Sequence, residues 1–489
     1  MQTTLKKYQM YIDGEFVDSN SKETIQVINP ATEEYISEIP RGTKEDVRKA
    51  ISSSNAAQKY WEKIPAVERG QYLHKIATNI RDKSSLLAET ISEEMGKPLN
   101  LSEVEVNFTA DYIDYMAEWA RRYEGEIIQS DRPNENIYLY KKPIGVTAGI
   151  LPWNFPFFLI ARKVAPALVT GNTSVIKPSE ESPNNAVKFA EIVDEINLPK
   201  GVFNLVTGTG SIVGDELARN PEVGLVSITG SFDAGSAVMR AASDNVTKVS
   251  LELGGKAPAI VMDDADIDLA VDSIVASRII NTGQVCNCAE RVYVHKSIEK
   301  EFLEKISEKI RNSKYGNPLN NKDIHMGPLI NQDAVASVDR KVQTAVQEGA
   351  SIVTGGNTVE GTGYYYEPTV IKNANNNMEI MREEIFGPVI PIATFETLDE
   401  AIDLANDSEY GLTSSLYTHN LDVAMRVSNE LKVGETYINR ENFENMQGFH
   451  AGWGKSGIGG ADGKHGVEEY LQTHVVYLQY NQNKNNGVN

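Results

Sequence analysis

Both cysteines of this 489-residue chain, Cys286 and Cys288, lie two positions apart in the stretch NTGQVCNCAE, residues 281–290. A thiolate is a strong nucleophile, and a polar Gly/Gln/Asn loop offers backbone N–H groups that lower the pKa of a thiol. We therefore predict that Cys286 is a nucleophile, and we treat Cys288 as a packing residue. The alternative is two buried cysteines that only fill space. A metal site is not predicted, because structural zinc needs four ligands and no closely spaced histidine pair lies nearby.

A thiol nucleophile needs an acid/base partner, and the stretch SLELGGK (250–256) offers Glu252. This carboxylate stands at an otherwise apolar strand end, where an unpaired charge is costly unless it has a function. We predict that Glu252 is a general base. The alternative is a buried carboxylate that pairs with Lys256 or with the backbone.

Two glycine-rich turns follow predicted strands, one with Gly208, Gly210 and Gly214 and the other with Gly230, Ser231 and Gly235. Neither has the G-x-G-x-x-G pattern. Backbone N–H groups and a helix N-terminus in such turns can nevertheless bind a pyrophosphate. The alternative is that the glycines only make the turns.

A third strand end, SVIKPSEES, places Lys177 and Glu180 where they can bracket the hydroxyl groups of a ribose. A carboxylate at this place repels a 2′-phosphate, which favours NAD over NADP. The alternative is an ion pair in a solvated loop.

The elements that must position these residues alternate between helix and strand. Residues 45–125 read as mostly helical, and short β-branched runs from 145 to 254 alternate with helical segments such as 184–196. A second series begins after 256, with a helix over roughly 267–280 ahead of Cys286 and strands at RVYVHK and GETYINR. The pattern predicts two α/β domains with mostly parallel sheets.

Composition excludes several classes of partner. With 68 acidic and 47 basic residues the net charge is −21, which repels nucleic acid and anionic lipid surfaces. No secretory signal is visible, and the most apolar stretch (145–161) is interrupted by Pro152, Trp153, Asn154 and Pro156. We expect a soluble cytoplasmic protein, since two cysteines suit a reducing compartment.

Six motifs occur in a fixed order: PWNFP (152–156), TGS (229–231), LELGGK (251–256), GQVC (283–286), EEIFGPV (383–389) and KSGIGG (455–460). In this order they resemble the NAD(P)-dependent aldehyde dehydrogenases over nearly the whole chain. Within that family the stretches around Cys286 and from 434 to 473 are most similar to the branch that oxidises lactaldehyde and glycolaldehyde. The resemblance implies two Rossmann-like α/β domains, one for the cofactor and one catalytic, and a small β extension for oligomerisation.

The resemblance also implies a mechanism. The Cys286 thiolate attacks an aldehyde carbonyl, and the Asn154 amide and the Cys286 backbone N–H hold the oxyanion. Hydride passes to NAD, and water activated by Glu252 hydrolyses the thioester on Cys286. Relatives that pass the acyl group to coenzyme A generally lack the carboxylate at Glu252, so hydrolysis is expected.

Further residues take cofactor and substrate roles by the same resemblance. The cofactor-binding residues would be Trp153, Lys177, Glu180, Gly210, Gly230, Ser231, Leu253, Glu384 and Phe386. As a hypothesis, the substrate pocket contains Arg162, Asn287, Glu444 and His450.

The sequence also leaves other substrates and functions open. Betaine aldehyde would bind among the aromatic faces of Trp153, Phe157, Phe449 and Trp453, and a semialdehyde would pair its distal carboxylate with Arg162. More remote readings are a thiol esterase without cofactor and a non-catalytic NAD-binding structural protein.

Domain limits follow from the same comparison of motifs. We expect residues 1–120 and 144–254 to bind NAD, residues 255–455 to form the catalytic domain, and residues 121–143 and 468–489 to bridge subunits. Exposed strands in the bridging segments need a partner. A homo-oligomer, either a dimer or a tetramer, is therefore expected, with pairing to another subunit.

Overall fold

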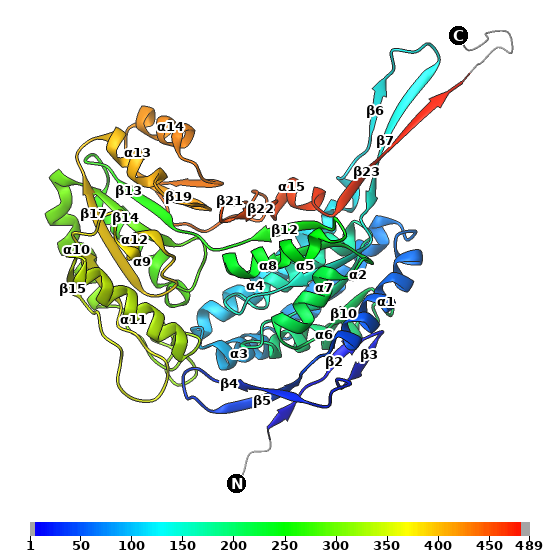
Figure 1. Ribbon diagram of the computed structural model, residues 1–489, viewed down its shortest axis with the longest axis horizontal. Coiled ribbons are helices and arrows are strands. Elements are labelled where there is room, and N and C mark those ends of the chain that lie inside the picture. Colours follow the sequence, from blue (N-terminus) through cyan, green and yellow to red (C-terminus); the bar gives the residue numbers. More distant parts are fainter. Residues whose placement is uncertain (1–4, 481–489) are drawn as a thin grey trace.

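The computed structural model describes residues 5–480, and its two large sheets lie on either side of the middle of the molecule (Figure 1). The first sheet has eight strands in the order β22-β12-β11-β8-β9-β10-β2-β3. Their bounds in that order are Gly457–Ile458, Lys248–Glu252, Val223–Thr229, Val146–Ile150, Thr173–Lys177, Phe203–Leu205, Met10–Ile12 and Glu15–Val17. The five strands from β12 to β10 run parallel.

Helices cover both faces of this sheet, which is why its central strands are buried apolar runs. Helix α8 and the first half of α1 pack on one face with α7, and α5 and α6 pack on the other with α2 to α4 outside them. The bounds from α1 to α8 are Lys44–Trp61, Ala66–Asp82, Ser84–Met95, Leu99–Ala117, Phe158–Val169, Asn184–Glu195, Asp215–Arg219 and Phe232–Ser243.

Strand order reverses between β8 and β11. The chain runs outward from β8 through β9 to β10, then returns to β11 and β12 on the other side of β8. Ligands of open α/β sheets bind beyond the carboxyl ends of strands at such a reversal. The segments that begin at Leu151 and Gly230 leave the sheet at this place.

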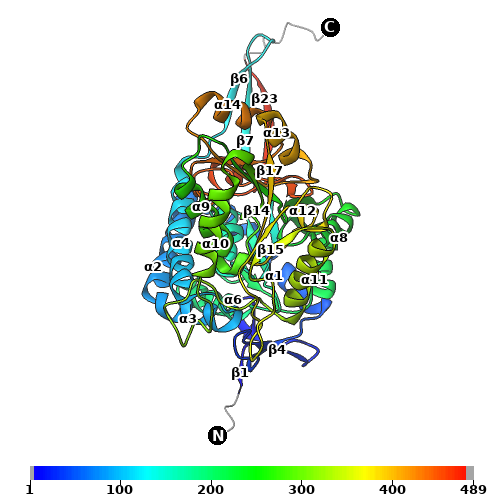
Figure 2. The same ribbon diagram turned by 90° about the vertical axis from the view of Figure 1, so that its left-hand side faces the viewer.

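The second sheet has seven strands in the order β15-β16-β17-β14-β13-β19-β20. Helices α9 and α10 cover one face and α11, α13 and α14 the other, and Figure 2 shows β14 and β17 between α9/α10 and α11/α12. The strand bounds in sheet order are Ser351–Thr354, Thr369–Lys372, Val389–Phe395, Ala289–His295, Ala257–Val261, Thr413–Tyr417 and Glu435–Ile438. The helix bounds from α9 to α14 are Ile267–Ile279, Glu299–Arg311, Gln332–Gln347, Glu379–Arg382, Leu398–Asn406 and Leu421–Glu430.

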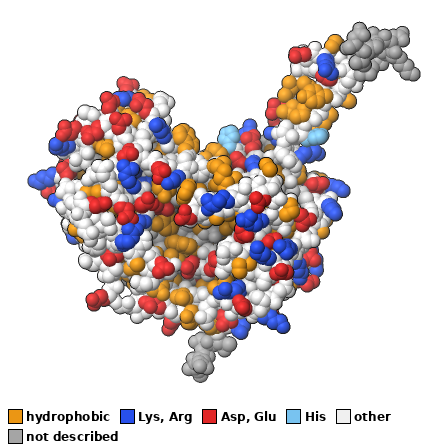
Figure 3. All heavy atoms as spheres, viewed as in Figure 1, with side chains coloured by type: hydrophobic (Ala, Val, Ile, Leu, Met, Phe, Trp, Pro, Cys, Tyr) orange, Lys and Arg blue, Asp and Glu red, His pale blue; other side chains and the backbone are white. Residues whose placement is uncertain are grey.

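A three-stranded sheet projects from the body as an arm (Figure 1). It consists of β6 (Glu126–Gln129), β7 (Glu135–Pro143) and β23 (Leu471–Gln479). Hydrophobic side chains gather on its surface (Figure 3). Strand β23 pairs along its whole length with β7 of the same chain, so β6 and β23 are the two edges of the arm. The predicted pairing with another subunit concerns these edges and stays a prediction. Residues 481–489 of the predicted bridging segment lie outside the described residues.

Smaller elements complete the chain. Strands β1 (Lys6–Lys7), β5 (Tyr35–Pro40) and β4 (Thr24–Ile28) form a sheet near the N-terminus, and β18 (Tyr410–Gly411) pairs with β21 (Trp453–Gly454). Helix α15 spans Gly463–Glu468. Among residues 5–480, no helix combines the length and apolar character needed to cross a bilayer.

The predicted fold class is confirmed, and so are the predicted helix before Cys286 and the strands at RVYVHK and GETYINR. One feature was not predicted. Residues 456–458 return to the first sheet, where Gly457 lies opposite Glu252 and the Ser456 carbonyl accepts a hydrogen bond from the Leu253 N–H at 2.9 Å. Ser456 and Gly457 lie in an irregular stretch whose sequence does not predict a strand.

Candidate active site

A cavity of about 580 Å³ opens at the point where strand order reverses in the first sheet, against the loops of the second. The catalytic, cofactor-binding and substrate-pocket candidates proposed from the sequence all line it. The catalytic candidates are Cys286, Glu252 and Asn154; the cofactor candidates are Trp153, Lys177, Glu180, Gly210, Gly230, Ser231, Leu253, Glu384 and Phe386; and the substrate candidates are Arg162, Asn287, Glu444 and His450. Residues from Trp153 to His450 therefore face one space.

The loop that carries Cys286 is held from both sides. Asn281, Thr282 and Gly283 have positive φ values of 47°, 60° and 75°, which turn the chain sharply after α9. The buried Gln284 side chain donates to the Asn281 carbonyl at 3.0 Å and accepts from the Ile330 N–H at 2.9 Å. The Cys286 thiol is partly exposed at the end of this rigid turn.

Asn154 fixes the other side of the loop. The side-chain amide nitrogen of Asn154 donates to the Gln284 backbone carbonyl at 2.9 Å. The backbone carbonyl of Asn154 accepts from the side-chain amide of Asn281 at 3.1 Å. A primary amide has two N–H donors. The second remains for an oxygen beside Cys286.

Glu252 ends β12 and is buried. Its Oε2 accepts from the Thr229 hydroxyl at 2.7 Å and lies 2.9 Å from the Lys163 ammonium, while no described residue donates a hydrogen bond to Oε1. Burial opposes the charge, but Lys163 and Arg162 outweigh it and lower the pKa of Glu252 to about 2. Glu252 is thus ionised, and it is a weak base while Lys163 stays beside it.

Lys163 was missed by the sequence analysis, although a signal was present. It is a lysine inside the apolar helix FLIARKVAPALV, and a buried charge in such a run needs a partner. The partner proposed for Glu252 as an alternative, Lys256, instead pairs with Glu290 at 2.8 Å.

Arg162 is enclosed by carboxylates. Its guanidinium binds Asp462 with two hydrogen bonds of 3.1 and 2.5 Å and Glu444 with one of 2.9 Å, and it lies 4.0 Å from Glu252. The second oxygen of Glu444 accepts from the Asn287 amide at 2.7 Å. The charge of Arg162 is therefore compensated within the protein.

His450 is buried beside Cys286. Its Nδ1 lies 2.8 Å from Oε1 of Glu435. Burial opposes protonation, but Glu444, a hydrogen bond with the Cys286 thiol and Glu435 outweigh it, so the pKa of His450 lies well above its usual value. At neutral pH the imidazolium presents a proton donor to the cavity.

At the far end of the cavity Lys177 and Glu180 pair with each other. The ammonium of Lys177 lies 2.9 Å from Oε2 of Glu180, and Oε1 of Glu180 accepts from the Gly210 N–H at 3.0 Å. The ion pair that sequence analysis kept as an alternative is thus present, although the Lys177 side chain is buried rather than solvated.

The start of α8 offers a place for an anion. The Ser231 hydroxyl accepts from the Ala234 N–H at 3.2 Å as the helix cap. A Cβ on Gly230 would have no neighbour closer than 3.8 Å, whereas a Cβ on Gly235 would lie 2.5 Å from Leu253. Gly235 therefore brings α8 close to β12 and leaves the helix N-terminus facing the cavity.

Glu384 and Phe386 line the cavity between these two ends. Oε1 of Glu384 accepts from the Gly255 N–H at 2.9 Å, and a Cβ on Gly254 would lie 2.4 Å from Oε2. Burial and the charge of Glu290 raise the pKa of Glu384 to about 7. The rings of Phe386 and Trp153 meet edge to face, with centroids 5.6 Å apart.

The aromatic group considered for betaine aldehyde does not assemble. Of its four members only Trp153 lines the cavity. Phe157 lies in the core, and the Trp453 side chain is 53% exposed outside the cavity.

Comparison with known proteins agrees with this geometry. The model of the aldehyde dehydrogenase family matches residues 16–476. The chain is 64% identical over 473 residues to lactaldehyde dehydrogenase of Escherichia coli (strain K12), covering 97% of this chain and 99% of that one.

Two solved structures were compared as well. A crystal structure of lactaldehyde dehydrogenase from Escherichia coli superposes with a TM-score of 0.97 at 63% identity, covering 98% of this chain and 100% of that one. Betaine aldehyde dehydrogenase from Staphylococcus aureus in complex with NAD+ superposes with a TM-score of 0.95 at 38% identity, covering 98% and 97%.

Proposed function

Since the chain belongs to the aldehyde dehydrogenase family, we propose that it oxidises a small 2-hydroxyaldehyde, lactaldehyde or glycolaldehyde, to its carboxylic acid with NAD. The observation that carries this proposal is a single cavity in which Cys286 and Glu252 face a network of polar and charged side chains. The relative with 64% identity is named for lactaldehyde.

In the proposed reaction the Cys286 thiolate forms a bond to the aldehyde carbon. The Asn154 amide and the Cys286 backbone N–H stabilise the oxygen that becomes negative. NAD, when bound, supplies the oxidation by accepting hydride from that carbon. Water then attacks the thioester on Cys286 while Glu252 takes its proton, and the bond from carbon to sulfur breaks to release the acid.

Glu252 must become a stronger base for the hydrolysis step. Its pKa of about 2 is held down by Lys163 once burial is overcome. Burial lowers the pKa of Lys163, which eases loss of the lysine proton or its separation from Oε2. The free Oε1 of Glu252 is the atom we assign to the water molecule.

The substrate end of the cavity suits a hydroxyl group next to the aldehyde. Glu444 offers an acceptor, and Asn287 and the His450 imidazolium offer donors. A plain alkyl aldehyde leaves such groups unpaired, which a buried site penalises strongly.

Semialdehydes are disfavoured at the same place. Arg162 is already paired with Asp462 and Glu444, so its guanidinium is not free to pair with a distal carboxylate. The four aromatic rings considered for the quaternary ammonium of betaine aldehyde do not meet in the cavity, because only Trp153 among them lines it.

The cofactor end fits NAD by its donors and its charge. The N-terminus of α8 with Ser231 would hold the pyrophosphate, and Lys177 and Glu180 the adenosine ribose. The carboxylate of Glu180 repels a 2′-phosphate, which favours NAD over NADP. The structurally similar betaine aldehyde dehydrogenase was solved with NAD+.

We also propose the predicted domain roles, with residues 1–120 and 144–254 for the cofactor and 255–455 for catalysis. A homo-oligomer built through the arm would cover the exposed hydrophobic side chains of its strands. Both cysteines are free, which suits a reducing compartment, and we place the enzyme in the cytoplasm.

The test is kcat/KM with NAD and with NADP for lactaldehyde, glycolaldehyde, propanal, betaine aldehyde and succinate semialdehyde, measured by the absorbance of the reduced cofactor. We expect the hydroxyaldehydes with NAD to lead. A lead for betaine aldehyde, or a flat profile, would contradict the substrate assignment. Hydrolysis of a chromogenic ester, without reduction of NAD or NADP by any of the five aldehydes, would favour the esterase. Inactivity in both assays would favour the structural protein.

Two variants locate the specificity within the cavity. His450→Gln and Glu444→Gln should each raise KM for lactaldehyde more than KM for propanal, because only the former uses the hydroxyl contacts. Equal effects on both aldehydes would remove these residues from substrate recognition.

A further inference from the structure

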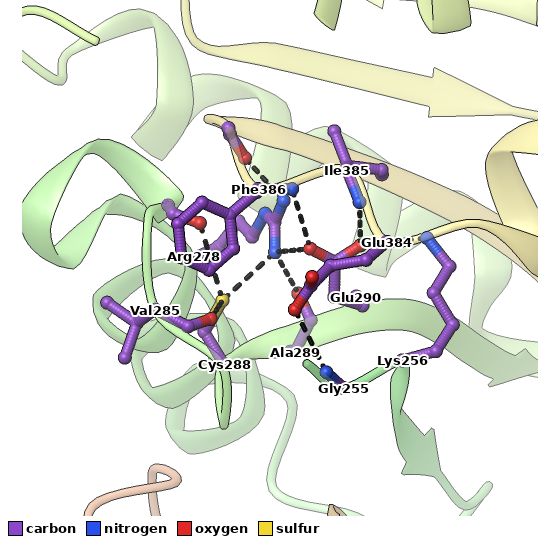
Figure 4. Close-up of polar contacts among 12 residues, drawn as sticks. Gly255, Lys256, Arg278, Val285, Cys288, Ala289, Glu290, Glu384, Ile385 and Phe386 are labelled. Atoms are coloured by element: carbon purple, nitrogen blue, oxygen red, sulfur yellow. Dashed lines mark hydrogen bonds and ion pairs between the residues drawn. The ribbon is translucent and has the colours of Figure 1, made fainter. Parts of the chain in front are cut away.

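Glu290 lies in β14, outside the cavity, and is completely buried. Its two oxygens pair with two cations that are equally buried (Figure 4): Oε2 lies 2.8 Å from the Lys256 ammonium and Oε1 lies 2.8 Å from the Arg278 guanidinium. The proposed reaction uses none of these three side chains. Three buried charges without contact to substrate or cofactor require another explanation.

The same two oxygens bind the backbone of the segment that lines the cavity. Oε2 accepts from the Ile385 N–H at 2.9 Å and Oε1 from the Phe386 N–H at 3.1 Å. Phe386 has a φ of 55°, a conformation that is unfavourable for a bulky L residue and persists only where its surroundings fix it. Glu290 therefore fixes the backbone from which Glu384 and Phe386 project.

Arg278 connects this segment to the nucleophile loop. It donates to the Cys288 sulfur at 3.0 Å and also to the Gly387 carbonyl. A Cβ on Gly283 would lie 2.3 Å from that same carbonyl oxygen, so the two segments pack backbone against backbone. One buried network thus sets the distance between the loop of Cys286 and the segment of Glu384.

We propose that Glu290 is a positioning residue that, with Lys256 and Arg278, sets the nicotinamide end of the cofactor relative to the Cys286 thiol. The inference rests on the proposed function, in which Glu384 binds the nicotinamide ribose. Glu290 touches neither cofactor nor substrate and acts through the backbone of residues 385 and 386.

Charge adds a second effect, which can be separated from position. After burial, the charge of Glu290 is the main factor that raises the pKa of Glu384 to about 7. Loss of the Glu290 charge therefore lowers the pKa of Glu384. A shorter carboxylate at this position keeps the charge but cannot reach both backbone N–H groups and both cations.

Two variants test the inference. In Glu290→Asp we expect Kd for NAD, measured by calorimetry, to rise about tenfold, the equivalent of about 1.4 kcal/mol, with its pH profile unmoved. In Glu290→Gln we expect a similar loss of affinity and a pH profile of Kd moved to lower pH. The rate at which iodoacetamide alkylates Cys286 without NAD should stay within about twofold in both, since the thiol itself is unchanged.

Glu290→Gln leaves two buried cations unpaired and risks misfolding, and Glu290→Asp keeps the test valid in that case. Asp46→Asn is the matched control, because Asp46 is a buried carboxylate that accepts from the Thr43 N–H at 2.9 Å outside the cavity. It should leave Kd for NAD unchanged.

Glu384→Gln tests the ribose-binding role of Glu384 separately from the positioning role of Glu290. If this variant binds NAD as the unaltered enzyme does, the ribose role of Glu384 in the proposed function is wrong. If Glu384→Gln weakens NAD binding but Glu290→Asp does not, the positioning role of Glu290 is overturned while the proposed function stands.

Discussion

The ionisation state of each charged side chain in this site depends on the oppositely charged groups beside it. Glu252, Arg162 and Glu444 are all buried or nearly so, and each has at least one oppositely charged group within 4.0 Å. Such ion pairs keep the groups ionised inside the protein, and they also limit the ability of each group to gain or lose a proton. Glu252 beside Lys163 is the clearest case, because the ion pair that keeps the Glu252 carboxylate charged also lowers its affinity for a proton.

Lys163→Gln tests this restraint. Lys163 is the first of the groups that hold the pKa of Glu252 below its usual value, so loss of its charge raises that pKa. In the pH–rate profile of thioester hydrolysis, the fall in rate on the acid side should move to higher pH by about 1 to 3 pH units. This is the usual effect of one close opposite charge on a pKa. The measurement is the single-turnover hydrolysis rate across the neutral and mildly acidic range.

Thr229→Val is a suitable companion, since Thr229 donates to the same oxygen without carrying charge. It should move the fall in rate on the acid side less than Lys163→Gln does. A fall in rate at unchanged pH in Lys163→Gln would mean that Lys163 has left Glu252 before hydrolysis begins.

Local chemistry explains how much of the site could be predicted from sequence. Cys286 and Glu252 are conspicuous because their residue types conflict with their immediate neighbours, and the ordered motifs supplied the remaining candidates. The charges around Arg162 could not be derived in this way. Its partner Asp462 lies 300 positions away, and local sequence carries no signal for a contact that only the folded chain creates.

At the scale of elements, three buried carboxylates perform the same task at three segments. Glu94 accepts from the N–H groups of residues 184 and 185, Glu105 from those of 157 and 158, and Glu290 from those of 385 and 386. Each pair of N–H groups belongs to a segment close to cavity residues. The first two pairs lie at the starts of α6 and α5, where N–H groups have no partner within the helix, and the third lies in an irregular segment. Side chains from neighbouring elements thus bind backbone groups that regular structure leaves unpaired.

Strand β22 positions the last residue of β12 in a comparable way. Gly457 lies opposite Glu252, has a φ of 146°, and a Cβ there would lie 2.0 Å from the Leu251 carbonyl oxygen. Gly457→Ala should therefore disrupt the pairing beside Glu252. We expect a lower Tm and a fall in the hydrolysis rate on the order of tenfold to a hundredfold, since misplacement of a catalytic group by about 1 Å has effects of that size.

Gly361→Ala is the matched control. Gly361 also has a positive φ, 119°, but a Cβ there would have no neighbour within 4 Å. Backbone strain alone, about 1–3 kcal/mol, is then the same in both variants. If the two lower Tm equally and neither slows hydrolysis, β22 has no part in positioning Glu252.

At the scale of the whole molecule, the arm is the part that its own chain leaves uncovered. Ile127 in β6 is 75% exposed and Tyr477 in β23 is 65% exposed. Their registers with β7 place them on opposite faces, because Ile127 pairs with Tyr138 and Tyr477 with Ile137. Both faces and both edges of this sheet are available to a second copy of the chain.

Substitution of either residue by aspartate should weaken the homo-oligomer that we propose. Ile127→Asp and Tyr477→Asp place a charge in a surface that an oligomer would bury, so the molar mass in solution, measured by light scattering, should fall in at least one of them. Val246→Asp is the control, since Val246 is 91% exposed but lies outside the arm. An unchanged mass in both arm variants would exclude the arm as the interface.

The architecture was predictable because it depends on repeated local patterns. Buried strands such as β8 and β9 are short β-branched runs, and helices follow them, α5 buried along its whole length and α6 amphipathic. The order of strands was not predictable, and neither was the return of residues 456–458. Both depend on which surfaces bury each other, and the short stretch Ser456, Gly457 and Ile458 has no pattern of its own.

That return also has a consequence for biosynthesis. A ribosome releases the chain from its N-terminus at about 5–20 residues per second, so β12 emerges long before the residues that cover its outer edge. Only when residues 457–458 follow does the strand that bears Glu252 gain its second neighbour. A nascent chain already carries the Cys286 thiol while this edge is still open. A message that ends before codon 457 specifies a protein that has Cys286 but lacks the strand that completes the sheet beside Glu252.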